Sequence, residues 1–161
     1  MLLRTIAAVS TLISGLIVLF GNYSPWVLLV LYAVCWLGLL LLAVLFLCIL
    51  CAFVDLDKPQ EEDSKFYRAV MHIYIEALIK LVRLKVEVSG LEKTPKEGRF
   101  LLVCNHCNDS DPIILLHVLR KFQLAFISKR ENSTMFVIGP MMHKLLCQLI
   151  NRENDREALK T

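Results

Sequence analysis

The charged residues of this chain are distributed very unevenly along its length. The first 54 residues contain one charged side chain, Arg4, although the whole sequence has 18 Lys and Arg and 15 Asp and Glu. A long segment with almost no charge is typical of membrane-spanning helices and not of a soluble domain. From residue 55 onward, basic and acidic residues occur in nearly equal numbers, as in a small water-soluble domain. The sequence therefore predicts two parts that lie in different surroundings.

Two apolar stretches in the first part are long enough to cross a bilayer. They cover residues 2–20 and 26–54, and a helix needs about 20 residues to span the hydrocarbon core. Residues 21–25 between them contain glycine, asparagine and proline, which favour a tight turn. A signal peptide is the alternative for the first stretch, but no A-x-A-like cleavage motif precedes a polar segment. We therefore expect a transmembrane helical hairpin over residues 1–54.

Basic residues lie at both ends of the expected hairpin and are absent from its turn. Arg4 lies at the start of the first stretch, and Lys58, Lys65 and Arg68 follow the second. Lys and Arg residues near the ends of membrane helices stay on the cytoplasmic side. We therefore expect an integral membrane protein with both termini and the polar domain in the cytoplasm.

The polar part predicts a small domain of the α/β class. Residues 55–64 are acidic, contain Pro59 and lack apolar periodicity, which is typical of a linker. After Ser64, a capping residue, apolar side chains recur every three or four residues as far as residue 84. This predicts an amphipathic helix that lies on the membrane surface or packs on the domain. Later apolar runs alternate with helical patterns, which predicts crossover units and a largely parallel sheet. The expected strands are residues 85–90, 100–104, 124–128 and 147–150, and the expected helices are residues 113–122 and 135–146.

The composition argues against several classes of protein. The net charge is +3 and the two signs are mixed, which does not indicate nucleic-acid binding. The six cysteines are divided between the two parts, which does not indicate a disulfide-stapled secreted domain. Cys104 and Cys107 have a C-x-x-C spacing, so a redox pair or half of a zinc site remains an alternative. A structural zinc site needs four ligands, and only Cys147 or a distant histidine could complete the set, so we expect no metal. We also expect no cofactor.

The segment from Asn105 to Pro112 carries the candidate chemistry. It follows an apolar run expected to be a buried strand and precedes a helix start, where open α/β sheets place their ligand sites. A histidine has an ordinary pKa of about 6.5, so His106 is suited to accept a proton near neutral pH. Asp111, five residues later, can orient the ring and stabilise the imidazolium, as in the His-Asp half of a catalytic triad. The alternative is that both residues only cap local structure. No serine nucleophile in an elbow motif is apparent, so we expect His106 to activate a group of the substrate.

Asn105 and His106, followed by Asp111, resemble the N-H-x-x-x-x-D motif of the glycerolipid acyltransferase family that acylates lysophosphatidic acid. Neighbouring segments are similar to that family in order and spacing from residue 85 to residue 161. These segments are residues 86–92, 95–98, 126–129, 138–140 and 149–152. The resemblance implies a partial acyltransferase domain of α/β fold over residues 65–161, after the hairpin and the linker.

The resemblance also implies a reaction and a role for each site residue. The reaction is transfer of a fatty acyl group from acyl-CoA or acyl carrier protein to the free hydroxyl of a lysophospholipid in phospholipid biosynthesis. His106 would be the general base and Asp111 the residue that orients it. Asn105, Lys129 and Arg152 would bind substrate, with Arg152 at the family's phosphate-binding position in its second motif. The implied partners are therefore the lipid acceptor, the thioester donor and the membrane, without nucleic acid.

The sequence departs from the family pattern after its second motif. The family's Glu-Gly-Thr motif and its later proline-containing motif do not occur before Thr161. We therefore expect a C-terminally truncated copy, either a fragment or a natural short form, with impaired or altered activity. The leading alternative is a non-catalytic membrane-anchored protein that retains part of the fold to bind lipid or a partner.

Overall fold

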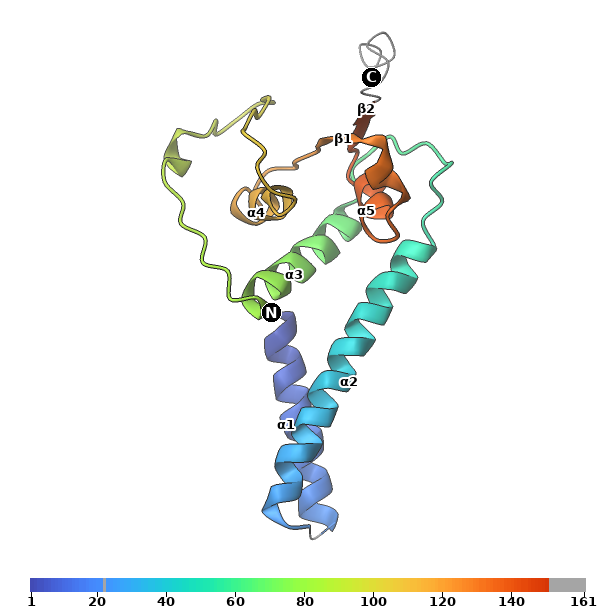
Figure 1. The fold of residues 1–161 in the computed structure, drawn as a ribbon, viewed down its shortest axis with the longest axis vertical. Coiled ribbons are helices and arrows are strands. Elements are labelled where there is room, and N and C mark those ends of the chain that lie inside the picture. The colour runs from blue at the N-terminus through green and yellow to red at the C-terminus, as the bar shows by residue number, and fades with distance from the viewer. Residues whose placement is uncertain (22, 151–161) are drawn as a thin grey trace.

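The computed structural model describes residues 1–21 and 23–150, and Figure 1 shows a narrow two-helix stem below a broader domain. Helix α1 covers Leu2–Gly21 and helix α2 covers Pro25–Ala52, so the two predicted apolar helices are confirmed. Both are long and apolar enough to cross a membrane. They run antiparallel, and the N-terminus lies at the same end of the stem as the domain. The two helices therefore form an antiparallel pair whose outer ends lie near the domain.

Small residues let the two stem helices pack closely. Ser10 and Ser14 of α1 are fully buried where α1 packs along α2. Their hydroxyls donate to the carbonyl oxygens of Ile6 and Ser10, at 2.8 and 2.7 Å, so each polar group is satisfied within its own helix. Small side chains four residues apart are a common means of close helix approach in lipid.

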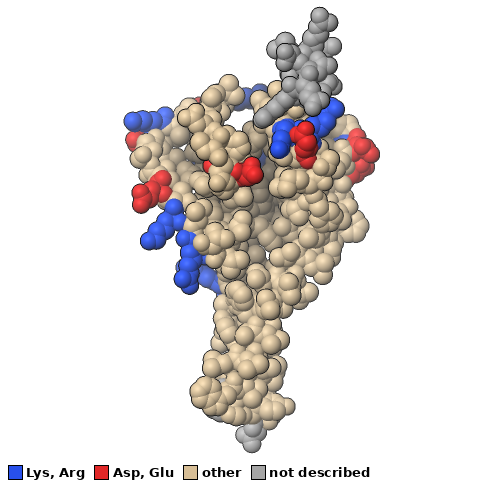
Figure 2. Space-filling model, in the orientation of Figure 1, with Lys and Arg blue, Asp and Glu red and all other residues tan. Residues whose placement is uncertain are grey.

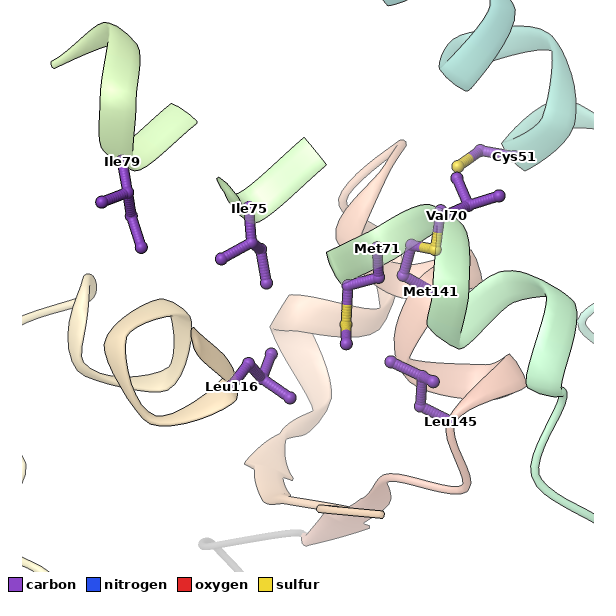
Figure 3. Packing of buried hydrophobic residues seen from close by; sticks show 8 residues of the cluster. All are labelled: Cys51, Val70, Met71, Ile75, Ile79, Leu116, Met141 and Leu145. Carbon is purple, nitrogen blue, oxygen red and sulfur yellow. The ribbon is translucent and has the colours of Figure 1, made fainter. Parts of the chain in front are cut away.

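Helix α3, Lys65–Leu81, organises the domain. The Ser64 hydroxyl accepts a hydrogen bond from the Tyr67 amide at 3.4 Å, which confirms the predicted N-cap. One face of α3 is buried against α4 (Asp111–Val118) and α5 (Ile138–Lys144). The core cluster in Figure 3 brings together the last turn of α2, helix α3, helix α4 and the region of α5. Its buried members are Cys51, Val70, Met71, Ile75, Ile79, Leu116, Met141 and Leu145.

Helix α3 is also attached to the stem by polar contacts. The Tyr67 hydroxyl donates to the Leu50 carbonyl oxygen at 3.2 Å, and the Tyr74 hydroxyl donates to that of Ala43 at 2.5 Å. The N-terminal amine of Met1 lies 3.2 Å from a carboxylate oxygen of Glu76. Both stem helices therefore contact α3. The sequence predicted that this helix lies on the membrane surface or packs on the domain, and the structure shows it packed on the domain and on the stem.

A buried ion pair closes the start of the domain. Arg68 on α3 donates to the two carboxylate oxygens of Asp63 at 2.7 and 2.6 Å, and also to the Leu124 carbonyl oxygen at 3.1 Å. The Arg68 and Asp63 side chains are only 10% and 12% exposed. This arrangement joins the end of the linker, helix α3 and the segment before the sheet. The sequence pattern did not predict it.

Replacing Asp63 by alanine is therefore expected to destabilise the domain by about 3–5 kcal/mol, because it leaves the buried Arg68 guanidinium without its counter-charge. The measurement is the shift in thermal unfolding of the protein in detergent. The double variant Asp63→Ala/Arg68→Met removes both charges and should recover most of that loss. Equal unfolding temperatures for wild type and Asp63→Ala would contradict a structural role for the pair.

The sheet is parallel, as predicted, but small. Strand β1, Ile127–Lys129, pairs with β2, Gln148–Ile150, in a register that aligns Ile127 with Gln148. The chain between them forms the short 3₁₀ helix η2 (Arg130–Thr134) and α5, so a helical crossover joins two parallel strands. Helix α5 begins at Ile138 and helix α4 ends at Val118, which makes both helices shorter than predicted.

The prediction of strands at residues 85–90 and 100–104 was wrong, since neither segment forms a strand with any described part of the chain. These segments have no strand assignment, and the 3₁₀ helix η1, Leu91–Lys93, lies between them. Leu101 and Val103 are 82% and 81% exposed, although the apolar run predicted a buried strand. A β-strand is stable only when an adjacent strand forms backbone hydrogen bonds with it. No described segment pairs in this way with residues 85–90 or 100–104.

Candidate active site

The candidate site lies where the chain enters helix α4. Asp111 is the first residue of this helix and Pro112 the second, where a proline is tolerated because its missing amide hydrogen would be unpaired anyway. Ser110 precedes the helix without making a side-chain cap. The core contact of Leu116 with the α3 side of the domain holds α4 in place. The first turn of α4 is thereby fixed relative to α3.

One carboxylate oxygen of Asp111 organises the loop before the helix. Asp111 Oδ2 accepts hydrogen bonds from the backbone amides of Cys107 at 2.8 Å and Asn108 at 2.9 Å. It also lies 3.1 Å from Nδ1 of His106. The predicted neighbours His106 and Asp111 are therefore in contact, and the backbone of the intervening turn wraps around the carboxylate.

Asn108 supports this turn from the other side, a role that the sequence interpretation missed. Its side-chain oxygen accepts from the backbone amide of Ser110 at 3.0 Å and from the Ser110 hydroxyl at 3.2 Å. An asparagine followed two residues later by serine is a typical signal for such an Asx turn, so the sequence contained the clue.

The electrostatics of the loop keep Asp111 ionised. Hydrogen bonds from the amides of Asn108 and Cys107 lower the pKa of the Asp111 carboxyl, and the contact with His106 lowers it further. A carboxylate near a helix N-terminus is also favoured by the helix dipole. An ionised Asp111 can only accept hydrogen bonds, so a neutral His106 must carry its proton on Nδ1, as assigned from this network. The other ring nitrogen, Nε2, then has a free lone pair.

The pair is accessible to a large molecule. The His106 side chain is 57% exposed and that of Asp111 is 28% exposed. His106 to Asp109 line an open hollow of about 350 Å³. The arrangement therefore combines an exposed histidine base with a more protected carboxylate, which is suited to removing a proton from a hydroxyl that approaches from outside.

The other residues predicted to bind substrate are placed less closely. Asn105 and Lys129 are exposed, the latter at the end of β1. Within residues 1–21 and 23–150, no hydrogen bond or ion pair joins either of them to His106 or Asp111. Arg152 lies outside the described residues. Among the predicted site residues that the structure describes, His106 and Asp111 are brought into contact, and Asn105 and Lys129 are not joined to them.

The cysteines near the site are free thiols. Cys104 and Cys107 are both exposed and unpaired by any disulfide. In the described part of the chain, no group of three or more His, Cys, Asp or Glu side chains is arranged to hold a metal ion. The structure thus offers no described ligand set for the zinc alternative.

Comparison with known protein families gives one match. Residues 85–161 match the family model described as acyltransferase. This region contains the His106–Asp111 pair, helices α4 and α5 and both strands. No similar curated protein and no similar solved structure was found. The match supports acyl transfer in general, and it identifies neither the acceptor nor the thioester donor.

Proposed function

We propose that this protein transfers a fatty acyl group from acyl-CoA or acyl carrier protein to the free hydroxyl of a lysophospholipid, with lysophosphatidic acid as acceptor and phosphatidic acid as product. The observation that carries the proposal is the contact between His106 and an ionised Asp111 within a region that matches an acyltransferase family. The exposed ring suits a large acceptor, since a lipid headgroup must reach it.

The proposed reaction begins with proton transfer. Nε2 of His106 takes the proton of the acceptor hydroxyl while its oxygen attacks the carbonyl carbon of the thioester. Asp111 stabilises the imidazolium that results, because its carboxylate is 3.1 Å from Nδ1. The tetrahedral intermediate then collapses, the carbon–sulfur bond breaks and the leaving thiolate receives the proton from His106. The acyl group moves directly to the acceptor, and no acyl-enzyme forms.

Substrate binding by Asn105, Lys129 and Arg152 is part of the proposal. A phosphate group is commonly held by charge-assisted hydrogen bonds from Arg and Lys, and a guanidinium can bind two phosphate oxygens at once. Lys129 is exposed at the carboxyl end of β1, the edge at which parallel sheets place ligands. Asn105 adjoins the catalytic histidine and can bind a polar group of the acceptor.

We also propose that the stem spans a membrane with both of its ends and the domain on the cytoplasmic side. A lysophospholipid resides at the membrane surface, so a domain anchored there meets its acceptor without extracting it. Arg4 and the basic residues after α2 lie at the domain end of the stem, whereas the described part of the turn is uncharged.

This topology predicts opposite labelling of two engineered cysteines. In a background that lacks Cys104 and Cys107, a Ser24→Cys variant should react with a membrane-impermeant maleimide only from the extracytoplasmic side. An Asp57→Cys variant should react only from the cytoplasmic side, since Asp57 is exposed beyond the end of α2. Labelling of both positions from the same side would exclude a spanning hairpin.

The direct test of the proposed activity is an assay of acyl transfer by the intact protein in detergent–lipid micelles. Lysophosphatidic acid and lysophosphatidylcholine are offered as acceptors, each with acyl-CoA and with acyl carrier protein. We expect phosphatidic acid to form, and the donor that supports it identifies the thioester used. Lipid binding without any acylated product would support the non-catalytic alternative and overturn the proposal.

A further inference from the structure

The C-terminal end of helix α3 presents an exposed surface of mixed apolar and basic residues. Its exposed members are the apolar Leu81, Val82 and Leu84 and the basic Lys80, Arg83 and Lys85, which together are called the interfacial patch. Figure 2 shows Lys and Arg side chains gathered where the narrow stem meets the domain. Apolar side chains interleaved with Lys and Arg are typical of segments that lie in the headgroup region of a bilayer.

The distance of α3 from the turn of the stem can be estimated along each of the two stem helices. Ala43, which accepts the Tyr74 hydrogen bond, lies 18 residues after the start of α2 at Pro25, or about 27 Å along the helix at about 1.5 Å per residue. Met1, which pairs with Glu76, precedes the 20-residue helix α1, which is about 30 Å long. The hydrocarbon core of a bilayer is about 30 Å thick. Both stem helices therefore hold α3 at the level where the hydrocarbon core ends.

The patch is built on a rigid helix end. The Leu84 amide donates to the Ile79 carbonyl oxygen at 3.0 Å, and the Arg83 amide donates to that of Lys80 at 3.2 Å. These two bonds form a Schellman motif, in which the residue after the cap adopts a left-handed backbone. Here that residue is Arg83, with φ of 53°, at a position where glycine is usual. The motif therefore fixes the backbone from which the side chains of Arg83 and Leu84 project.

We propose that the interfacial patch docks into the anionic phospholipid headgroup layer on the domain side of the membrane. The apolar members would enter the boundary with the acyl chains, continuing the apolar surface of the stem. Arg83 and Lys85 would contact lipid phosphates, whereas Lys80 is paired with the Glu76 carboxylate on the same helix. The inference rests on the membrane insertion of the stem included in the proposed function.

Docking of the patch gives the candidate site a fixed height and orientation. Ile75 and Ile79 of α3 belong to the same buried cluster as Leu116 of α4. The first turn of α4 carries Asp111, which holds His106. With α3 supported by the stem and by the lipid surface, the domain is prevented from swinging away from the membrane. The acceptor hydroxyl of a membrane lipid would then reach His106 in a constant position.

Fluorescence quenching by lipids with brominated acyl chains tests this proposal in the intact protein. The chain has two tryptophans, Trp26 and Trp36, so replacing both with phenylalanine gives a background for one new tryptophan. In vesicles of phosphatidylcholine and phosphatidylglycerol, we expect strong quenching of Leu81→Trp and little quenching of Leu101→Trp. Leu101 is the matched control because it is also exposed, and Figure 1 shows the chain near residue 100 on the side of the domain away from the stem. A Val82→Trp variant should repeat the result for Leu81→Trp.

The contribution of charge is tested with Arg83→Gly/Lys85→Gln. Glycine fits the left-handed backbone at residue 83 without strain, so this variant removes two charges while preserving the turn. Each basic residue near an anionic surface favours contact by roughly fivefold, so loss of two should weaken the docking equilibrium by roughly twenty-five-fold. We expect quenching of Leu81→Trp to fall in phosphatidylglycerol vesicles to its level in pure phosphatidylcholine. Lys96→Gln/Arg99→Gln, an equal loss of exposed charge elsewhere, should have no effect.

The outcomes separate this inference from the anchor on which it rests. A variant that retains only Trp36 reports insertion of the stem. Quenching of Trp36 with no more quenching of Leu81→Trp than of Leu101→Trp would overturn docking of the patch and leave the spanning stem intact. Absence of Trp36 quenching would overturn the spanning stem itself. Quenching of Leu81→Trp that is unchanged by Arg83→Gly/Lys85→Gln would overturn the assignment of anionic headgroups as the partner.

Discussion

Replacing His106 by alanine is expected to reduce acyl transfer by the intact protein by at least about a hundredfold, because general-base assistance typically contributes 10²–10⁴-fold. Within the described residues, His106 is the only basic side chain that contacts the Asp111 carboxylate. The measurement is the initial rate of phosphatidic acid formation at saturating donor. Binding of the acceptor should be little affected, since the proposed phosphate contacts come from other residues.

His117→Gln provides a control for this experiment. His117 is a half-buried histidine on α4, the same helix that carries Asp111, and the proposed mechanism does not use it. Near-wild-type rates are expected for this variant. If His106→Ala retained near-full activity while remaining folded, the proposed general-base mechanism would be wrong.

Asp111→Asn is expected to lower kcat by about 10²–10⁴-fold with a small change in KM, because a neutral amide does not stabilise the imidazolium that forms on His106. Oδ2, the atom that contacts Nδ1 of His106, also accepts from the two backbone amides, so the asparagine oxygen takes its place. The amide oxygen can still accept from the backbone amides of Cys107 and Asn108. The loop should therefore keep its shape while turnover falls.

The same variant separates the electrostatic role of Asp111 in the loop from its role in turnover. The pKa of Asp111 is lowered in the folded protein, so ionisation favours the folded loop at every pH above the ordinary value of about 4. This contribution is lost as the pH falls through the lowered pKa. Thermal unfolding between pH 6 and pH 3, measured in detergent, should lose less stability on acidification in Asp111→Asn than in wild type. Identical acid dependence would indicate that the carboxylate does not support the loop, and a full kcat in the same variant would exclude it from turnover.

The helices were predictable because their signals are local. The stem helices followed from apolar length, since a helix satisfies its backbone hydrogen bonds within its own segment wherever it is placed. Helix α3 followed from its apolar spacing and from the Ser64 cap, whose partner is only three residues away. The contact of His106 with Asp111 was predictable for the same reason, because one turn before a helix brings two residues five apart into reach.

The sheet and the attachment of the domain were decided by tertiary structure. Residues 85–90 and 100–104 have the composition of strands, but a strand depends on the hydrogen bonds of a distant neighbour, and none of the described segments supplies them. The Arg68 pair with Asp63 and the bond from Arg68 to Leu124 join parts of the chain that no periodicity relates. The amphipathic pattern of α3 likewise left open whether it faced the membrane or the domain. The contacts of α3 with both stem helices and with the core decided its position. Packing depends on which surfaces meet in space, whereas a sequence gives only the composition of each surface.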